Sequence, residues 1–260
     1  MTPPDTPASA STPADTAQVT LARLAQADFC FLPATATRAW LTMIAPAWAA
    51  DWGPFAASWN ALELDTWMAD GGRYRRRRYA TLSATPGSDA LSREPHQPHY
   101  QSLDYNPLNG GVARHFAPID EAVLRGATMQ AALALGLRCY ATLQPAQAAH
   151  VEVHQFRIEA NPDSAGLPTP EGAHRDGVDF VAVFLVGRHE IRGGETRVFD
   201  ANGPDGQRFT LIEPWSLLLL DDTRVIHEST PIQPVDHDAP GGYRDTLVLT
   251  FRADGFQSEA

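Results

Sequence analysis

Two potential metal ligands occupy alternate positions in the segment "GAHRDGVDF", residues 172–180, just before the apolar run "VAVFLV". Alternate side chains of an extended strand point to the same face, so His174 and Asp176 are expected to converge on one point. A third ligand would have to come from a strand that is close in space but distant in sequence. The best candidate is His227 in "DDTRVIHEST", which ends a predicted strand after the apolar segment "SLLLL".

Two imidazoles and one carboxylate on a rigid β scaffold form the facial triad of non-haem Fe(II) oxygenases, which leaves coordination positions open for a co-substrate and O₂. The alternative is solvated turn chemistry, because a His-x-Asp triplet also occurs by chance in many proteins. The rest of the pattern favours the triad. We also expect Asp221 or Asp222, which lie close to His227 in the sequence, to orient its imidazole.

A candidate anion anchor lies in the last β-rich segment, "GYRDTLVLTFR". Arg244 and Thr246 alternate there onto one face, and a guanidinium beside a hydroxyl is suited to binding a carboxylate. The alternative is a strand-edge arginine paired with an Asp or Glu. Arg252 has the same even spacing, but along an ideal strand it would lie about 27 Å further on, so Arg244 is the predicted anchor.

The elements that position these residues change character along the chain. Residues 1–18 are rich in Pro, Thr, Ser and Ala and predict a disordered tail. Between 19 and 149 the pattern predicts helices and loops. The expected helices cover 37–48, 58–72 (with Ser58 as N-cap and Gly71 as stop) and 118–137 (with Asp120 as N-cap), and a strand is expected at 74–82.

From 150 to 252 the sequence consists of short β-rich runs separated by Gly, Pro, Asn and Asp. Such spacing predicts a sandwich or barrel rather than alternating βαβ units. Helices followed by strands indicate an α+β fold in which N-terminal helices pad the β structure. Because no linker separates the two parts, residues 19–260 are predicted to form a single domain.

The composition narrows the classes of function. A length of 260 residues with 43% hydrophobic residues supports a substantial core, and a net charge of −11 argues against general binding to nucleic acid or anionic membranes. No segment approaches the roughly 20 apolar residues of a membrane span, and residues 1–18 lack the basic region and the apolar region expected of a secretory signal. Two cysteines without a pattern, Cys30 and Cys139, are expected to be buried and reduced, which fits a cytoplasmic enzyme.

Five sequence blocks together resemble the double-stranded β-helix of 2-oxoglutarate/Fe(II) dioxygenases. They are "HQFRIEA", "HRDGVDFVAVFLV", "GGETRVFD", "LLLLDDTRVIHESTPI" and "YRDTLVLTF". They are most similar to a bacterial group of free amino-acid hydroxylases typified by L-isoleucine dioxygenase. "YRRRRYATL" and "YNPLNGGVARHF" also resemble that group. One departure is a longer interval between His227 and Arg244, where "PVDHDAPGG" is interpreted as a hairpin insertion.

The resemblance implies a jelly-roll, cupin-like core over residues 150–252. It implies Fe(II) bound by His174, Asp176 and His227, and 2-oxoglutarate as co-substrate with its far carboxylate on Arg244 and Thr246. The implied reaction is hydroxylation by O₂ of an aliphatic C–H bond in a small molecule, with a free L-amino acid as the favoured substrate.

The resemblance also places the strand "VHQFRI" beside the active site. Gln155 and Arg157 alternate on it and could bind the C1 carboxylate of 2-oxoglutarate or the substrate carboxylate; an equal alternative is a structural hydrogen-bond network. His154 points to the other face and is expected to be structural. The other histidines show no ligand spacing and are expected to be surface or capping groups: His96, His99, His115, His150, His189 and His237.

Two upstream segments have polar residues that could reach a substrate. The arginines at 75–78 alternate faces on the predicted strand; they form either a solvated, ion-paired face or an inward contact to a substrate carboxylate. The loop "YNPLNGG", residues 105–111, is a candidate lid in which Asn106 and Asn109 could bind an amino-acid head group.

Two other interpretations remain open. A cupin-like metal enzyme that does not use 2-oxoglutarate would need no arginine anchor, so binding of 2-oxoglutarate separates it from the dioxygenase. A non-catalytic β-sandwich with a binding or regulatory role would have only a vestigial site, and stoichiometric Fe(II) uptake would argue against it.

Overall fold

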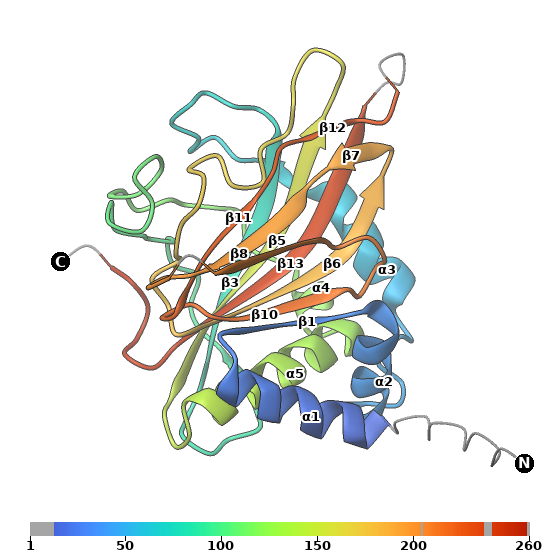
Figure 1. Cartoon of the computed structure of the whole chain (residues 1–260), viewed down its shortest axis with the longest axis vertical. Coiled ribbons are helices and arrows are strands. Elements are labelled where there is room, and N and C mark those ends of the chain that lie inside the picture. Colours follow the sequence, from blue (N-terminus) through green and yellow to red (C-terminus); the bar gives the residue numbers. More distant parts are fainter. Residues whose placement is uncertain (1–12, 204, 237–240, 259–260) are drawn as a thin grey trace, which may run out of the picture.

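The computed structural model describes residues 13–203, 205–236 and 241–258 (Figure 1). Both the N-terminal and the C-terminal parts of the chain contribute strands. The early strands are β1 (Phe29–Leu32), β2 (Glu63–Leu64), β3 (Arg75–Ala84) and β4 (Ser92–Arg93). The later strands are β5 (Ala149–Ala160), β6 (Phe180–His189), β7 (Ile191–Gly193), β8 (Glu195–Asp200), β9 (Gly206–Thr210), β10 (Leu217–Asp221), β11 (Val225–Ser229), β12 (Ile232–Pro234) and β13 (Gly242–Arg252). The helices are α1 (Pro13–Gln26), α2 (Ala34–Ile44), α3 (Trp52–Ala57), the 3₁₀ helix η1 (Ser58–Ala61), α4 (Glu121–Leu124) and α5 (Ala127–Leu143).

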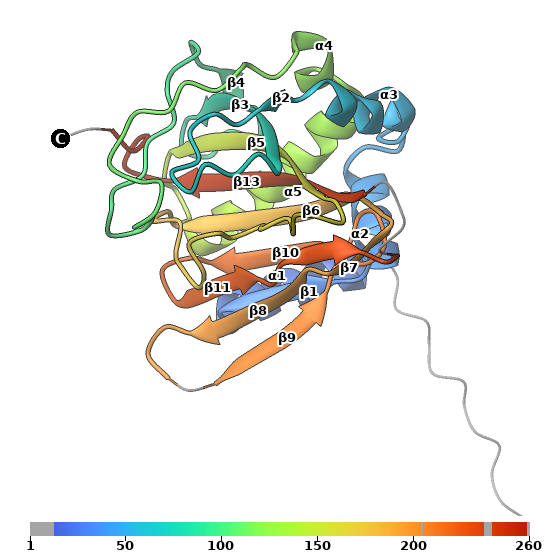
Figure 2. The same cartoon turned by 90° about the horizontal axis from the view of Figure 1, so that it is seen from above.

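Most strands belong to one large antiparallel sheet of order β1-β10-β6-β13-β5-β3-β2, with β4 paired to β3. A smaller sheet, β11-β8-β9, and the pair β12-β7 complete the structure. Figure 2 shows β8, β9 and β11 beside the large sheet and α1, α2 and α5 along it. This is the predicted α+β jelly roll, and β1 to β4 extend its sheet beyond the predicted 150–252 segment.

The central strands bury both faces, which explains their continuous hydrophobicity. Leu217 and Leu219 of β10 belong to the core shared with the helices, whereas Leu218 and Leu220 pack inside the jelly roll. A strand covered on both sides therefore reads as an apolar run without alternation, as "SLLLL" does.

Helix α5 lies directly on this sheet because Gly136 has no side chain at the contact. A Cβ there would lie 2.8 Å from Cζ of Phe251 and 3.2 Å from Cδ1 of Leu249. The predicted packing of this helix on the outer face of the sheet is confirmed. Asp120 is the N-cap residue of α4, as predicted, although its side chain makes no capping hydrogen bond; the single helix predicted over 118–137 is instead divided into α4 and α5. Asp51 accepts hydrogen bonds from the backbone N–H (2.9 Å) and the hydroxyl (2.6 Å) of Thr128 at the start of α5.

The helix predicted over 58–72 is also wrong. The chain forms only η1 and then pairs as β2 with β3. Asp65 explains the extended path, because its buried carboxylate accepts hydrogen bonds from Arg75 of β3 at 2.7 Å and from the backbone N–H of Trp67 at 2.9 Å. A tertiary ion pair thus overrides the local helical periodicity.

Helix α1 corrects the boundary of the predicted tail, because residues 13–18 are helical and Leu24 of the same helix lies in the core. Residues 1–12, like His237 and the hairpin residues 237–240, lie outside the described residues. Cys30 and Cys139 are free and buried, as predicted. Among the described helices, none combines the length and the apolar character that crossing a membrane requires.

Candidate metal centre

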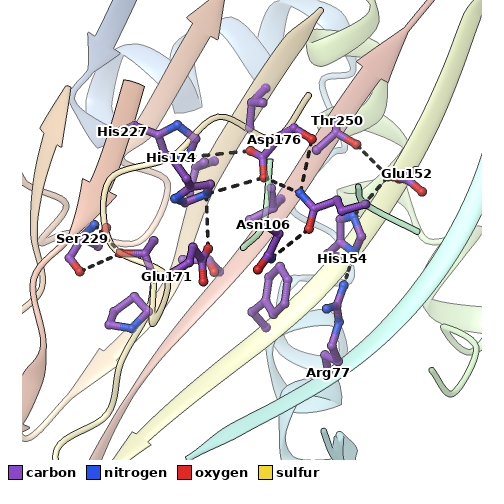
Figure 3. Close-up of a pocket in the computed structure, with 18 of the residues that line it drawn as sticks. Arg77, Asn106, Glu152, His154, Glu171, His174, Asp176, His227, Ser229 and Thr250 are labelled. Atoms are coloured by element: carbon purple, nitrogen blue, oxygen red, sulfur yellow. Dashed lines mark hydrogen bonds and ion pairs between the residues drawn. The ribbon is translucent and has the colours of Figure 1, made fainter. Parts of the chain in front are cut away.

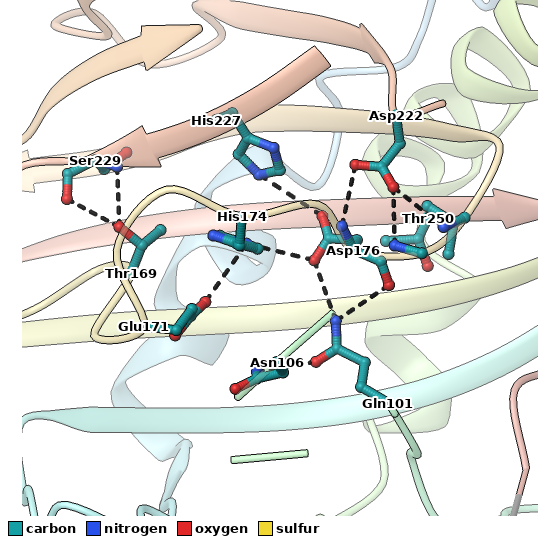
Figure 4. Close-up of polar contacts among 12 residues, drawn as sticks. Gln101, Asn106, Thr169, Glu171, His174, Asp176, Asp222, His227, Ser229 and Thr250 are labelled. Carbon is teal, nitrogen blue, oxygen red and sulfur yellow. Dashed lines mark hydrogen bonds and ion pairs between the residues drawn. The ribbon is translucent and has the colours of Figure 1, made fainter. Parts of the chain in front are cut away.

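His174, Asp176 and His227 meet at one end of the jelly roll, as their spacing predicts (Figures 3 and 4). His174 and His227 are paired through their backbones: each N–H donates to the carbonyl of the other, at 3.0 and 2.9 Å. The carboxylate of Asp176 faces both rings, with Oδ1 3.7 Å from Nε2 of His174 and Oδ2 3.7 Å from Nε2 of His227. The three potential ligand atoms lie within 4.8 Å of one another.

The surrounding contacts fix which ring nitrogen is available. Nδ1 of His174 lies 2.9 Å from the carbonyl of Gly172, so a proton on Nδ1 leaves Nε2 for a metal. Asp222 is fully buried and accepts hydrogen bonds from the backbone N–H of Asp176 (3.1 Å), Gly177 (2.8 Å) and Val178 (3.1 Å), as Figure 4 shows in part. Asp222 therefore holds the loop that carries Asp176. The expectation that it orients the imidazole of His227 is corrected, because its oxygens are committed to backbone.

The carboxylate of Asp176 influences the protonation of both imidazoles beside it. Burial would lower the pKa of His174, but the hydrogen bond to Asp176 and the charges of Asp176 and Glu171 outweigh burial and raise it to about 9. Burial and the neighbouring His174 lower the pKa of His227 to about 4. Near neutral pH His174 thus keeps a second proton, on Nε2 and facing the carboxylate of Asp176, and a metal ion bound there would take the place of that proton. The carboxylate attracts a positive charge at the position where a metal ion would lie.

Arg244 and Thr246 line the same cavity from β13. Arg244 is buried, and its Nε has no hydrogen-bond partner. Burial and the nearby Arg188 lower the pKa of Arg244 to about 10, so the side chain is still cationic at neutral pH. Within the described residues no carboxylate lies at ion-pairing distance from Arg244, which argues against the strand-edge alternative. Arg252 donates to the carbonyl of Gly255 at 3.3 Å and does not line the cavity.

Gln155 and Arg157 point to the other face of β5, which corrects their predicted position at the ligand site. Arg157 forms two hydrogen bonds of 2.7 Å with the buried carboxylate of Asp245, and Gln155 donates to Oγ of Ser58 at 2.8 Å. The even-numbered residues of β5 face the cavity instead, His154 among them. The strand was correctly predicted, but its inward face was assigned one residue out of phase.

The arginine run of β3 alternates between the two sides of the sheet, as expected for a strand. Arg75 and Arg77 are buried and line the cavity. Arg76 pairs with Glu159 at 2.9 Å, and Arg78 pairs with Glu63 at 2.9 Å, both on the outer side. The run therefore combines the two alternatives that the sequence left open, since one pair is ion-paired outside and the other faces inward.

The loop after β4 also contributes to the cavity. Asn106 lines it and donates to Oε1 of Gln101 at 3.1 Å (Figure 4). Asn109 is turned away, because its side-chain oxygen accepts a hydrogen bond from the backbone N–H of Ala69 at 2.9 Å. Of the two asparagines considered for a head-group contact, only Asn106 has access to the cavity.

A second group of histidines and a carboxylate, His99, Glu152 and His154, was missed by the sequence analysis. These residues are buried in the opposite wall of the cavity, where Figure 3 shows Glu152 and His154, and the potential ligand atoms of all three lie within 4.8 Å of one another. Glu152 already accepts hydrogen bonds from Tyr79 at 2.5 Å and from Thr250 at 3.3 Å. Period-2 alternation across "HVEVHQF" was the available signal for Glu152 and His154, but nothing in the sequence pointed to His99.

This second group is closed to a metal ion. Nη2 of Arg77 lies 2.7 Å from Nδ1 of His154, and since guanidinium can only donate, the proton of His154 is on Nε2 and no lone pair remains. Burial and the charge of Arg77 lower the pKa of His154 well below its usual range. A cation would therefore compete with an arginine that is already in place.

Comparison with known proteins identifies the fold and its family. The family model described as 2OG-Fe dioxygenase matches residues 56–250, which is most of the chain. The chain belongs to the 2OG-Fe dioxygenase family. The crystal structure of a BsmA homolog from Methylobium petroleophilum PM1 is similar, with 44% identity, a TM-score of 0.82, and coverage of 94% of this chain and 96% of that one.

Two further similarities are more distant. The structure of IDO from Bacillus thuringiensis shares the fold, with a TM-score of 0.74, 16% identity, and coverage of 92% and 96% of the two chains. A 3(1)-hydroxy-L-isoleucine 4-dioxygenase from Pantoea ananatis is 23% identical over 159 residues, which are 60% of this chain and 64% of that enzyme. The matched part thus spans just under two thirds of that relative.

Members of this dioxygenase family use Fe(II) and 2-oxoglutarate, and the residues present fit both. His174, Asp176 and His227 would supply the two imidazoles and one carboxylate of a facial triad. A buried guanidinium with an unpaired Nε, Arg244, lies in the same cavity, where a dicarboxylate would supply the missing anion.

Proposed function

We propose that this protein is an Fe(II)- and 2-oxoglutarate-dependent dioxygenase that hydroxylates an aliphatic C–H bond of a free L-amino acid. One observation carries the proposal. A single cavity brings together the metal triad, the unpaired Arg244, and a separate wall of arginines with uncommitted donors. The cavity thus offers cationic side chains to two different anions beside one metal ion.

Arg244 and Thr246 would bind the far carboxylate of 2-oxoglutarate. Both project from β13 into the cavity, and a guanidinium in this position can form two parallel N–H···O bonds. Thr246 supplies a hydroxyl on the same face of the strand.

The substrate carboxylate would bind in the opposite wall, at Arg75 and Arg114. Arg114 is 1% exposed, donates to Oε1 of Gln101 at 3.1 Å, and has an Nε without a partner. Arg75 is paired with Asp65, but its Nη2 is also buried without a partner. Buried cationic donors without partners are costly, so an anionic ligand would stabilise them.

The apolar part of the cavity suits an aliphatic side chain. Val181, Val183, Leu218 and Val248 line it from β6, β10 and β13. When bound, Fe(II) with 2-oxoglutarate and O₂ supplies the oxidising chemistry that converts C–H to C–OH and releases succinate and CO₂. The contribution of the chain is to hold both ligands in register and to exclude water from the oxidised carbon.

The similarity to an enzyme that acts on hydroxy-L-isoleucine supports the choice of an amino acid as substrate. Succinate release with Fe(II), 2-oxoglutarate and O₂ should be measured with each proteinogenic L-amino acid in turn, and the product analysed by mass spectrometry. We expect at least one amino acid to increase succinate release and to gain one oxygen atom. Binding of 2-oxoglutarate without stimulation by any amino acid would contradict the substrate class. Absence of 2-oxoglutarate binding would contradict the dioxygenase itself.

A further inference from the structure

Glu171 is a carboxylate in the cavity that neither the triad nor the arginine wall accounts for. It lies in the loop before His174, and its side chain is only 8% exposed (Figures 3 and 4). Oε2 of Glu171 is buried and has no hydrogen-bond partner. Oε1 lies 3.4 Å from Nε2 of His174, the nitrogen that the Nδ1 contact leaves for a metal.

The other two carboxylates that line the cavity are already engaged. Glu152 accepts hydrogen bonds from Tyr79 and Thr250, and Asp176 faces both imidazoles. Glu171 differs because its one ion-pair contact among the described residues is with a nitrogen that a metal would occupy. With the metal bound, this buried carboxylate would have no donor from the protein.

A metal ion is a poor partner for Glu171 because the facial triad already supplies three protein ligands. A fourth would take one of the positions that the co-substrate and O₂ require. A ligand with a positive charge and several N–H donors fits the position better, and an ammonium group has three donors and no acceptor. The uncommitted donors of Arg75 and Arg114 line the same cavity and would bind a carboxylate.

We propose that Glu171 binds the α-ammonium group of the substrate and thereby selects free amino acids over their 2-hydroxy and N-acyl analogues. This inference rests on the proposed function, since it assigns the amine of the same substrate. Glu171 and the arginine wall together form a charge-complementary site for a zwitterion. The ammonium contact lies on the metal side of the cavity, and the carboxylate contact lies on the β3 side.

Calorimetry on the Mn(II)- and 2-oxoglutarate-loaded protein, which binds substrate without turnover, tests this assignment. The probes are the L-amino acid that releases most succinate in the screen above and the 2-hydroxy acid with the same carbon skeleton. The wild-type protein should bind the amino acid about 30-fold or more tightly than the hydroxy acid, because only the ammonium pairs with a buried charge. Glu171→Gln should weaken amino-acid binding by about 30-fold or more and change hydroxy-acid binding by less than about threefold.

Glu228→Gln is the matched control. Like Glu171, Glu228 lies close to a triad residue in the sequence, since it follows His227. Its side chain, however, pairs with Arg197 at 3.1 Å and lies outside the cavity. This variant should bind both probes and Mn(II) as the wild type does. The assignment is overturned if Glu171→Gln weakens Mn(II) binding, if it weakens both probes equally, or if it changes neither. If no amino acid binds or releases succinate, the proposed function fails as well, whereas amino-acid binding unaffected by Glu171→Gln removes this inference alone.

Discussion

Two groups of histidine and carboxylate side chains face each other across one cavity, yet among the described residues they differ in what their nitrogen atoms can still bind. In the first group, His174, Asp176 and His227, both Nε2 atoms face the carboxylate. In the second, His99, Glu152 and His154, the ligand atoms are equally close together but are occupied by protein hydrogen bonds. Residue types and spacing are therefore insufficient to define a metal site.

The difference arises from the strand that lies beside each group. The first group is formed where a loop pairs with β11, a strand of the small sheet, and within the described part of the chain no arginine is hydrogen-bonded to either imidazole. The second lies between β3 and β5, and β3 contributes Arg77 and Tyr79, which supply the donors that a metal would otherwise replace. One wall is thus open to a cation, and the other is a closed hydrogen-bond network that can shape the substrate side of the cavity.

The largest effect should come from removing a triad residue. His174→Ala, Asp176→Ala and His227→Ala should each abolish Fe(II)-dependent succinate release. The protein should stay folded, because a catalytic metal site with open coordination positions is not needed to hold the fold together. His154→Ala is the matched change in the second group and should still bind one metal ion per chain. Full activity in any one triad variant would remove that residue from the centre.

Arg244→Ala should have the next largest effect. The loss of one partner of a buried charge pair costs about 2–5 kcal/mol, which corresponds to roughly 30-fold to several thousand-fold in affinity. We expect the KM for 2-oxoglutarate to rise by that factor while metal binding is retained. Arg252→Ala, on the same strand but outside the cavity, should change neither quantity. A normal KM in Arg244→Ala would place the anchor elsewhere in the cavity.

Arg157→Ala tests the orientation of β5, because this arginine was first predicted to bind a ligand. Its removal leaves the buried Asp245 without its partner and should lower the free energy of unfolding by about 3–5 kcal/mol. Urea denaturation measures the loss, and the KM for 2-oxoglutarate should be unchanged. Arg76→Ala removes a half-exposed pair with Glu159 and should cost less than about 1 kcal/mol. A raised KM with normal stability in Arg157→Ala would show that the side chain faces the ligand.

The smallest expected effect concerns the closed group. Tyr79→Phe removes a hydroxyl that donates to the fully enclosed Glu152 and should lower the free energy of unfolding by about 1–3 kcal/mol. Metal content should stay at one ion per chain. Tyr74→Phe removes a hydrogen bond to the exposed Asp70 and should cost about 1 kcal/mol or less. A second bound metal in Tyr79→Phe would mean that the tyrosine hydroxyl, and not Arg77, keeps this group closed.

The sequence was most informative where chemistry and strand periodicity coincide. His174, Asp176 and Arg244 lie on or beside strands whose period-2 pattern assigns a face, and the structure brings all three to one cavity. The series of short β-rich runs predicted a sandwich or barrel, and the resemblance to 2-oxoglutarate/Fe(II) dioxygenases specified the jelly roll. By contrast, the phase of β5 was misjudged because both its faces are buried, so that polar residues occur at odd and even positions alike.

The remaining residues of the cavity could not be predicted from local pattern. His99 and Arg114 come from a long loop without periodicity, and their placement depends on pairing between residues 99 and 114. Asp65 and Asp51 each override a local helical signal by bonding to a distant element. Such tertiary contacts cannot be predicted from a short segment of sequence.

Anomalous diffraction from crystals grown with Mn(II) and 2-oxoglutarate tests the central claim most directly, because it locates the metal without relying on a variant. The account predicts one metal peak between Nε2 of His174, Nε2 of His227 and the carboxylate of Asp176, with 2-oxoglutarate extending from that peak toward Arg244. A peak between His99, Glu152 and His154, or a co-substrate that does not reach Arg244, would contradict it.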